Sequence, residues 1–118
     1  MPAELDAWLE LAIEEAIEPE LPICDPHHHL WSEHRAGLGK YTLDELQADT
    51  SSGHRVEQTV FVEARTSYRP DGPEHLSPVG ETEWVAGVAR QQPASTGAAI
   101  AGIVAFADLR LGSKLPEV

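Results

Sequence analysis

Cysteine is nearly missing from this sequence, with Cys24 as the single cysteine among 118 residues. One cysteine cannot form a disulfide within the chain, so nothing calls for an oxidising compartment. Long apolar runs are also missing, since no stretch approaches the roughly 20 residues that cross a bilayer. The acidic start Met-Pro-Ala-Glu-Leu-Asp differs from the basic start of a secretory signal. We therefore expect a cytoplasmic protein without a membrane span.

Basic residues are scarce, with 8 Lys and Arg against 20 Asp and Glu and a formal net charge of −12. This charge repels the phosphate backbone that supplies most nucleic-acid affinity, so we expect no nucleic acid among the partners. Aromatic residues make up only 6% of the chain, but the 42% share of hydrophobic residues allows a modest core. At 118 residues, the length fits one globular domain.

The N-terminal segment, residues 1–20, is strongly acidic and carries no basic residue. Its apolar residues recur at spacings of three and four over residues 3–18, which predicts an amphipathic helix with a solvated acidic face. Pro19 and Pro22 forbid a continuation of that helix. We therefore separate an acidic helix at 1–20 from a body at 21–118.

Strand signals recur through the body. Apolar or β-branched runs predict parallel strands near residues 21–27, 57–64 and 99–107. The third run is almost wholly apolar, which favours burial of both its faces. Cys24, in the first run, is expected to be buried as a small hydrophobic residue. Strands that alternate with helices indicate an α/β fold with crossover connections.

Two helices are expected between these strands. Thr42 and Glu45 have the spacing of a capping box, which predicts that a helix starts at Leu43. The other helix is expected to carry Pro78 in its first turn, with Ser77 as its N-cap.

Three histidines follow the first predicted strand. Because side chains two apart in a strand share a face, His27 and His29 are expected to point the same way, together with Asp25. His28 is expected to point to the opposite face. Two imidazoles on one face can share a divalent ion, with zinc the best fit and manganese possible. A catalytic zinc usually has three protein ligands, so the pair is incomplete, and no spacing connects it to His34, His54 or His75.

The structural alternative is a surface loop, or buried histidines bonded to backbone carbonyls. The position of the histidines favours a functional site, because they follow an apolar strand at its carboxyl end. This is the end at which α/β barrels place their chemistry.

The residues around the histidines form the run Ile23-Cys24-Asp25-Pro26-His27-His28-His29-Leu30-Trp31. This run resembles the Asp-x-His-x-His start of the amidohydrolase superfamily, and its Pro-His-His-His-Leu-Trp form resembles the amidohydrolase 2, or pyrone-dicarboxylate lactonase-like, branch. Segments 60–64 and 78–83 also resemble that branch, so the likeness spans roughly residues 20–112. It implies that residues 21–118 are a truncated, N-terminal portion of a TIM-like (β/α)8 metal-dependent hydrolase barrel, with the first three strands and their crossover helices.

The resemblance also implies a function. It suggests a metal-dependent hydrolase that acts on a lactone or a related ester or amide of a small-molecule substrate, with His27 and His29 as metal ligands. Some members are thought to work without a metal. The acid-base Asp would come from beyond Val118, so no catalytic residue is assigned in this chain. The fragment alone is expected to be inactive, and the full-length form could be a homo-oligomer. The alternatives are a non-oxidative decarboxylase of the same superfamily and a non-catalytic metal-binding module.

Other polar residues have two readings each. Glu63 could contact substrate or brace the neighbouring loop. Tyr41 could bind a substrate carboxylate or serve as a hydrophobic staple for the helix that follows it. Asp108 could face the pocket or cap a turn. Arg65 and Arg69 could clamp an anionic substrate, because a guanidinium matches carboxylate geometry, or they could be ordinary surface arginines.

Overall fold

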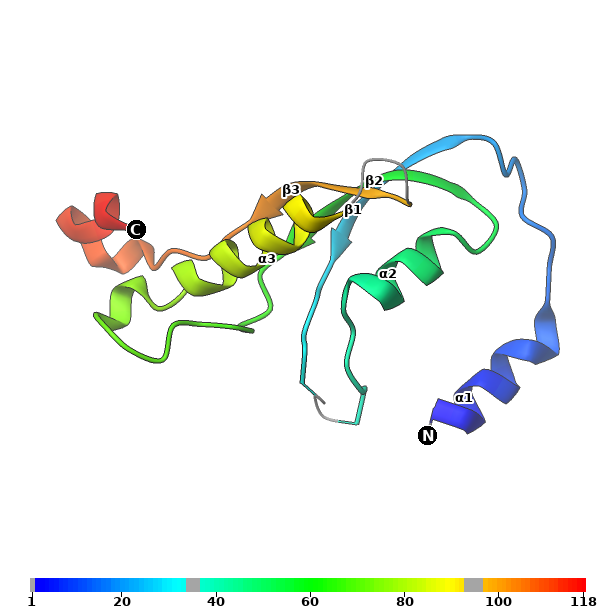
Figure 1. Ribbon diagram of the computed structural model, residues 1–118, viewed down its shortest axis with the longest axis horizontal. Coiled ribbons are helices and arrows are strands. Elements are labelled where there is room, and N and C mark those ends of the chain that lie inside the picture. The colour runs from blue at the N-terminus through cyan, green and yellow to red at the C-terminus, as the bar shows by residue number, and fades with distance from the viewer. Residues whose placement is uncertain (1, 34–36, 93–96) are drawn as a thin grey trace.

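The computed structural model describes residues 2–33, 37–92 and 97–118. Its centre is a three-stranded parallel sheet in the order β1-β2-β3, formed by β1 (Pro22–His28), β2 (Arg55–Val62) and β3 (Ala99–Val104). Helix α2 (Leu43–Thr50) lies between β1 and β2 in the chain, and α3 (Val79–Gln91) lies between β2 and β3 (Figure 1). The predicted α/β alternation with parallel strands is confirmed, although β3 ends at Val104 and not near residue 107.

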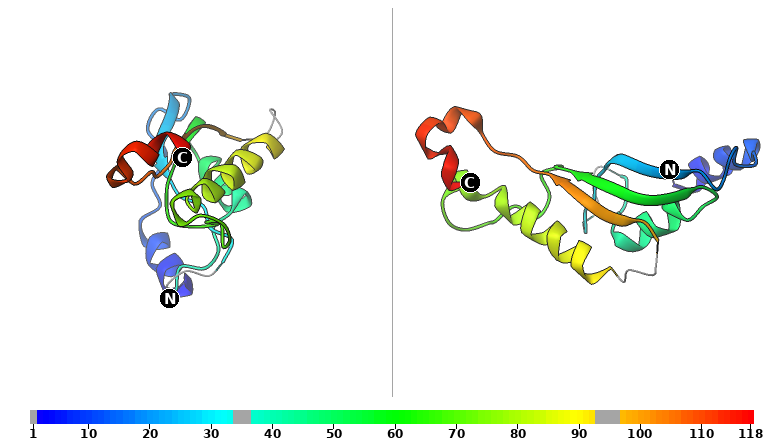
Figure 2. Two further views of the ribbon diagram at one scale, coloured as in Figure 1. Left: turned by 90° about the vertical axis from the view of Figure 1, so that its left-hand side faces the viewer. Right: turned by 90° about the horizontal axis from the view of Figure 1, so that it is seen from above.

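The core lies on one side of the sheet. Leu46 of α2 and Val85 of α3 pack with Phe61 of β2 and with Leu30, and these four side chains are at most 3% exposed. Both helices therefore cover the same face, as Figure 2 shows in its view from above. Burial of each such side chain contributes roughly 1.5–3 kcal/mol, so this cluster dominates the stability of the sheet.

The other face of the sheet is open in the described part of the chain. Val104 at the end of β3 is 52% exposed, which contradicts the prediction that both faces of this strand are buried. Cys24 is exposed as well, although it was expected to be buried. Cys24 pairs with Gln58 of β2, which is also exposed. Thr59, the residue after Gln58, points to the other face and is buried under the helices. The prediction was wrong because apolar character shows that a residue can be buried and not which face receives a covering layer.

The N-terminal segment extends away from the sheet (Figure 1). Helix α1 covers Pro2–Leu9, and a 3₁₀ turn at Glu10–Ala12 ends it where Ile13 adopts extended backbone. The predicted helix over residues 3–18 is therefore too long. Its apolar side chains, such as Trp8, remain mostly exposed. Short helices without tertiary packing are marginal in water, which explains the early end.

The starts of the two crossover helices test the capping predictions. Helix α2 begins at Leu43 as predicted, with a capping box in which the Thr42 N–H donates to Glu45 Oε2 at 2.7 Å. Hydrogen bonds from the side chain and backbone of Thr42 lower the pKa of Glu45 to about 2. Pro78, by contrast, is the N-cap of α3 and so precedes the first turn in which it was predicted. Ser77 is not the N-cap either, and its hydroxyl donates to the Arg69 carbonyl.

The chain after β3 turns at Asp108. Its carboxylate accepts the Arg110 N–H at 3.0 Å and caps a 3₁₀ segment at Leu109–Glu117, which supports the capping role among the two predicted for it. Hydrogen bonds from the Arg110 side chain and backbone lower the Asp108 pKa to about 2. Over residues 2–33, 37–92 and 97–118, no helix is long and apolar enough to cross a membrane.

Candidate functional site

His27 and His29 meet at the carboxyl end of β1. Their Nε2 atoms lie 3.3 Å apart, and their rings meet edge to face with centroids 5.0 Å apart. The prediction that the two side chains share a face is confirmed.

The ring of His29 is oriented by the next strand. Its Nδ1 lies 2.8 Å from the carbonyl oxygen of Val62, at the end of β2. A carbonyl only accepts hydrogen bonds, so Nδ1 carries the proton and donates it. In the neutral ring the lone pair is then on Nε2, which faces His27. This is the arrangement by which proteins orient a metal-ligating histidine.

His28 has a different role. It is 7% exposed, its Nε2 lies 3.0 Å from the Thr59 hydroxyl, and its ring meets that of Phe61 at a centroid distance of 5.8 Å. Desolvation by burial lowers the pKa of His28, which favours the neutral ring. The expectation that it points away from its two neighbours is confirmed.

Asp25 does not follow the simple alternation. In the sheet register Asp25 lies opposite Thr59 and His28 lies opposite Phe61, so β1 has one residue more than β2 between these two pairs. An extra residue of this kind is a β-bulge, and the side chains before it and after it no longer alternate in step. The register therefore aligns Asp25 with the buried His28, and its carboxylate accepts the backbone N–H of His27 at 3.1 Å.

The spacing of the histidine pair fits a shared metal ion. Two imidazole nitrogens at about 2.0–2.1 Å from a tetrahedral zinc are separated by about 3.3–3.4 Å. The observed separation of 3.3 Å between Nε2 atoms matches this value. No cluster of three or more His, Cys, Asp or Glu side chains that could hold a metal occurs among the described residues, which bring no third ligand to the pair.

The remaining histidines do not join the pair in the described structure. His54 directly precedes β2 and so lies at the amino ends of the parallel strands, opposite the carboxyl ends where His27 and His29 meet. His75 pairs with Glu117 at 2.9 Å. His34 lies outside the described residues.

Glu63 and Tyr41, the two predicted substrate ligands, both have partners within the chain. Glu63 Oε1 accepts from the Arg65 N–H at 3.0 Å and from the Tyr68 hydroxyl, and so braces the loop after β2. The Tyr41 hydroxyl donates to Asp49 at 2.6 Å. Burial and then the bond to Asp49 raise the pKa of Tyr41. A contact of either residue with substrate stays a prediction.

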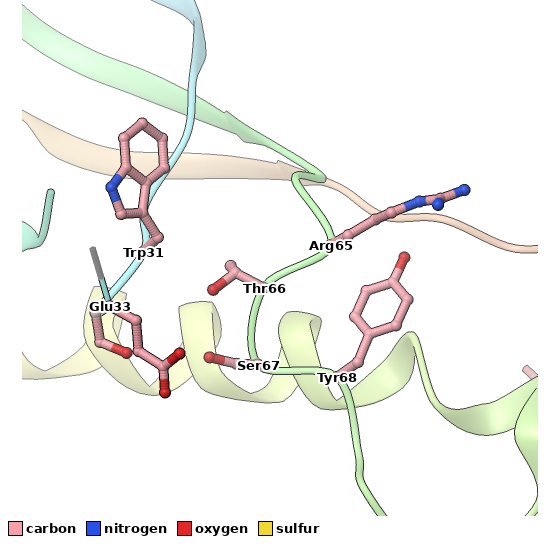
Figure 3. A pocket seen from close by; sticks show the side chains of 7 residues that line it. Trp31, Glu33, Arg65, Thr66, Ser67 and Tyr68 are labelled. Atoms are coloured by element: carbon pink, nitrogen blue, oxygen red, sulfur yellow. The ribbon is translucent and has the colours of Figure 1, made fainter. Parts of the chain in front are cut away.

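A cavity of about 370 Å³ opens beside these strand ends (Figure 3). It is lined by residues that follow β1 and β2, namely Trp31, Ser32, Glu33, Arg65, Thr66, Ser67 and Tyr68. Figure 3 shows the Thr66 and Ser67 hydroxyls on the side of Glu33, whereas Arg65 points away from Trp31. Of the two arginines predicted as a clamp, Arg69 pairs with Glu83, and only Arg65 lines the cavity.

Glu81 is a residue of this region that the sequence did not single out. It lies in the first turn of α3 and is 2% exposed. Its Oε1 accepts the N–H groups of Ala64 at 2.8 Å and Thr66 at 3.4 Å, while Oε2 has no hydrogen-bond partner among the described residues. Burial raises the Glu81 pKa above its usual value, and the nearby charge of Glu63 adds to this effect.

This shift predicts how stability depends on pH. A carboxyl group with a raised pKa binds its proton more tightly in the folded state than in the unfolded state. Its contribution to stability is therefore full below the unfolded pKa of about 4.3 and is lost as the pH rises through the folded pKa. We expect the free energy of unfolding of the wild type to fall with rising pH relative to that of Glu81→Gln. Urea unfolding of both proteins between pH 4 and 8 tests this, and a constant difference would contradict it.

The signal for Glu81 was present in the sequence only as an acidic residue among the apolar residues of a helix. Its partners at 64 and 66 belong to a loop, so no periodicity connects them to it.

Comparisons of the chain with protein-family models, with curated proteins and with solved structures found no match. The case for a function therefore rests on the residues of the site.

Proposed function

We propose that residues 21–118 supply the first three strands of an amidohydrolase-type (β/α)8 barrel, in a metal-dependent hydrolase that cleaves a lactone or a related ester or amide. The parallel sheet with helices between its strands supports the barrel, because parallel strands need crossover connections. The histidine pair at the carboxyl end of β1 supports the hydrolase, since barrels of this kind place their active sites at that end.

The observation that carries the proposal is the orientation of His29. Its bond to the Val62 carbonyl directs a lone pair toward His27, at a separation that suits two ligands of one tetrahedral ion. His27 and His29 would hold the ion, with zinc as the first choice for imidazole ligands and manganese as the second. Such an ion, when bound, polarises a carbonyl and makes water more acidic.

The cavity formed by residues that follow β1 and β2 suits a small polar substrate, although neither histidine lines it. Thr66 and Ser67 offer hydroxyl groups that can donate to or accept from a substrate oxygen. Arg65 also lines the cavity, although its guanidinium group points away from Trp31 (Figure 3). Trp31 lies two residues beyond His29 and adds an aromatic wall. We place the enzyme in the cytoplasm, in accord with its single cysteine.

A non-catalytic metal-binding module is the second candidate. The observation in its favour is that the described residues bring no third ligand to the histidine pair. A two-histidine site holds a metal more weakly than a complete ligand set does.

Activity measurements separate the two candidates. The full reading frame that encodes this chain should be expressed, freed of metal and assayed on a panel of lactones with added zinc or manganese. We expect metal-dependent hydrolysis that His27→Ala abolishes, and we expect residues 1–118 alone to bind metal without turnover. Metal binding by the full product without hydrolysis of any lactone, ester or amide tested would support the module.

A further inference from the structure

The loop after β2 has a strained backbone. Arg65 and Ser67 adopt left-handed conformations with φ of 57° and 53°, a region that residues with a Cβ rarely occupy. Strain of this kind persists only where surrounding contacts impose it, and it is concentrated at binding sites. Both residues line the 370 Å³ cavity, together with Thr66 between them.

Gly80 provides the first of these contacts. A Cβ at this position would lie 2.7 Å from the Ser67 carbonyl oxygen and 2.7 Å from the Arg69 backbone nitrogen. Contacts under 3.0 Å with backbone atoms cannot be relieved by a side-chain rotation. Only glycine therefore lets the first turn of α3 approach the loop this closely.

Glu81 provides the second contact, from the next position of the same turn. Its buried carboxylate accepts the backbone N–H groups on both sides of Arg65, those of Ala64 and Thr66. Two amides that converge on one oxygen fix the direction of the chain between them. The nearby charged groups are Glu63, which braces the loop through the Arg65 N–H, and Arg69, which is held by Glu83 on the surface.

We propose that Gly80 and Glu81 form a latch that holds loop 64–69 in its strained conformation and so positions Thr66 and Ser67 at the cavity. Both are positioning residues, since they act on ligand through the loop. The proposal rests on the proposed function only in taking the cavity as the place where substrate binds. The latch itself can be tested without a substrate.

The test uses ¹⁵N NMR of the 118-residue chain. In the wild type we expect the amide protons of Ala64 and Thr66 to shift together as the Glu81 carboxyl titrates, because ionisation strengthens the hydrogen bonds that it accepts. Glu81→Gln should abolish this common titration while both amides stay protected from hydrogen exchange. Glu81→Ala should speed their exchange by at least about tenfold, as loss of a charge-assisted hydrogen bond predicts.

Glu83→Gln is the matched control, because Glu83 is an exposed carboxylate on the same helix that pairs with the side chain of Arg69. It should leave the exchange and the titration of both amides unchanged. Gly80→Ala should shift the resonances of residues 65–69 and keep the sheet folded. The proposal is overturned if the amides still titrate together in Glu81→Gln, or if Gly80→Ala leaves the loop resonances in place. These two variants decide the matter even where Glu81→Ala does not fold.

Zinc affinity distinguishes this proposal from the proposed function. His29 bonds to Val62, and among the described residues neither imidazole is seen to bond to loop 64–69, so the Glu81 variants should bind zinc as the wild type does. A wild type that takes up no zinc would count against the metal site. It would leave the titration of Ala64 and Thr66 as the measure of the latch.

Discussion

Replacing His27 or His29 with alanine should lower the zinc affinity of the chain by at least about 100-fold, more than the loss of a supporting residue around a metal site causes. Each imidazole supplies one of the two nitrogens that face each other at 3.3 Å, and a single remaining imidazole cannot chelate. Competition with a chromophoric chelator measures the effect. His54→Ala is the control, because it removes an exposed imidazole at the amino ends of the strands, away from the pair.

His28→Ala separates the metal site from the fold. Its ring bonds to Thr59 and packs against Phe61, so we expect a loss of stability with zinc affinity near that of the wild type. In the proposed hydrolase, His27→Ala and His29→Ala should each cost at least about 100-fold in activity and His28→Ala far less. Equal loss of zinc binding in all three variants would contradict the assignment of faces.

Phe61→Ala should unfold most of the protein. Phe61 is 1% exposed near the carboxyl end of β2, in the central strand of the sheet, and belongs to the buried cluster that joins both helices to the sheet. Truncation of a buried phenylalanine costs about 3–5 kcal/mol, against a total stability of about 5–15 kcal/mol for a typical domain. A sheet with one covered face should be near the lower end of that range, so the variant should lose its cooperative transition.

Urea unfolding followed by circular dichroism tests this expectation. Phe106→Ala is the matched control, because Phe106 is 41% exposed beyond the end of β3 and its truncation leaves a much smaller buried cavity. We expect this control to unfold cooperatively near the wild-type midpoint. An equal loss of stability in both variants would show that the buried cluster is not the main source of stability.

Local signals in the sequence determined much of the fold. The apolar runs gave three parallel strands, and the spacing of Thr42 and Glu45 gave the start of α2 at Leu43. The alternation of strand side chains placed His27 and His29 on one face and His28 on the opposite face. These features depend on residues that are near each other in the chain, so their spacing contains the information.

Other features depended on contacts between distant residues, and here the sequence predictions were wrong or incomplete. The acidic helix ends early because no surface packs against it, and Cys24 and Val104 are exposed because both helices cover the opposite face. The bulge that aligns Asp25 with Thr59 and His28 with Phe61 appears only in the register between β1 and β2.

The candidate site also combines features set by local sequence with features set by contacts between distant residues. The sequence by itself predicted the histidine pair, because residues at i and i+2 of a regular strand share a face. Only the tertiary structure decided that Val62 orients His29 across 33 positions of sequence and that Glu81 binds the loop at 64–66. A backbone carbonyl or amide is the same chemical group at every residue. The choice of which one meets a given side chain is therefore made by the packing of the strands and helices, and no pattern of residue types records it.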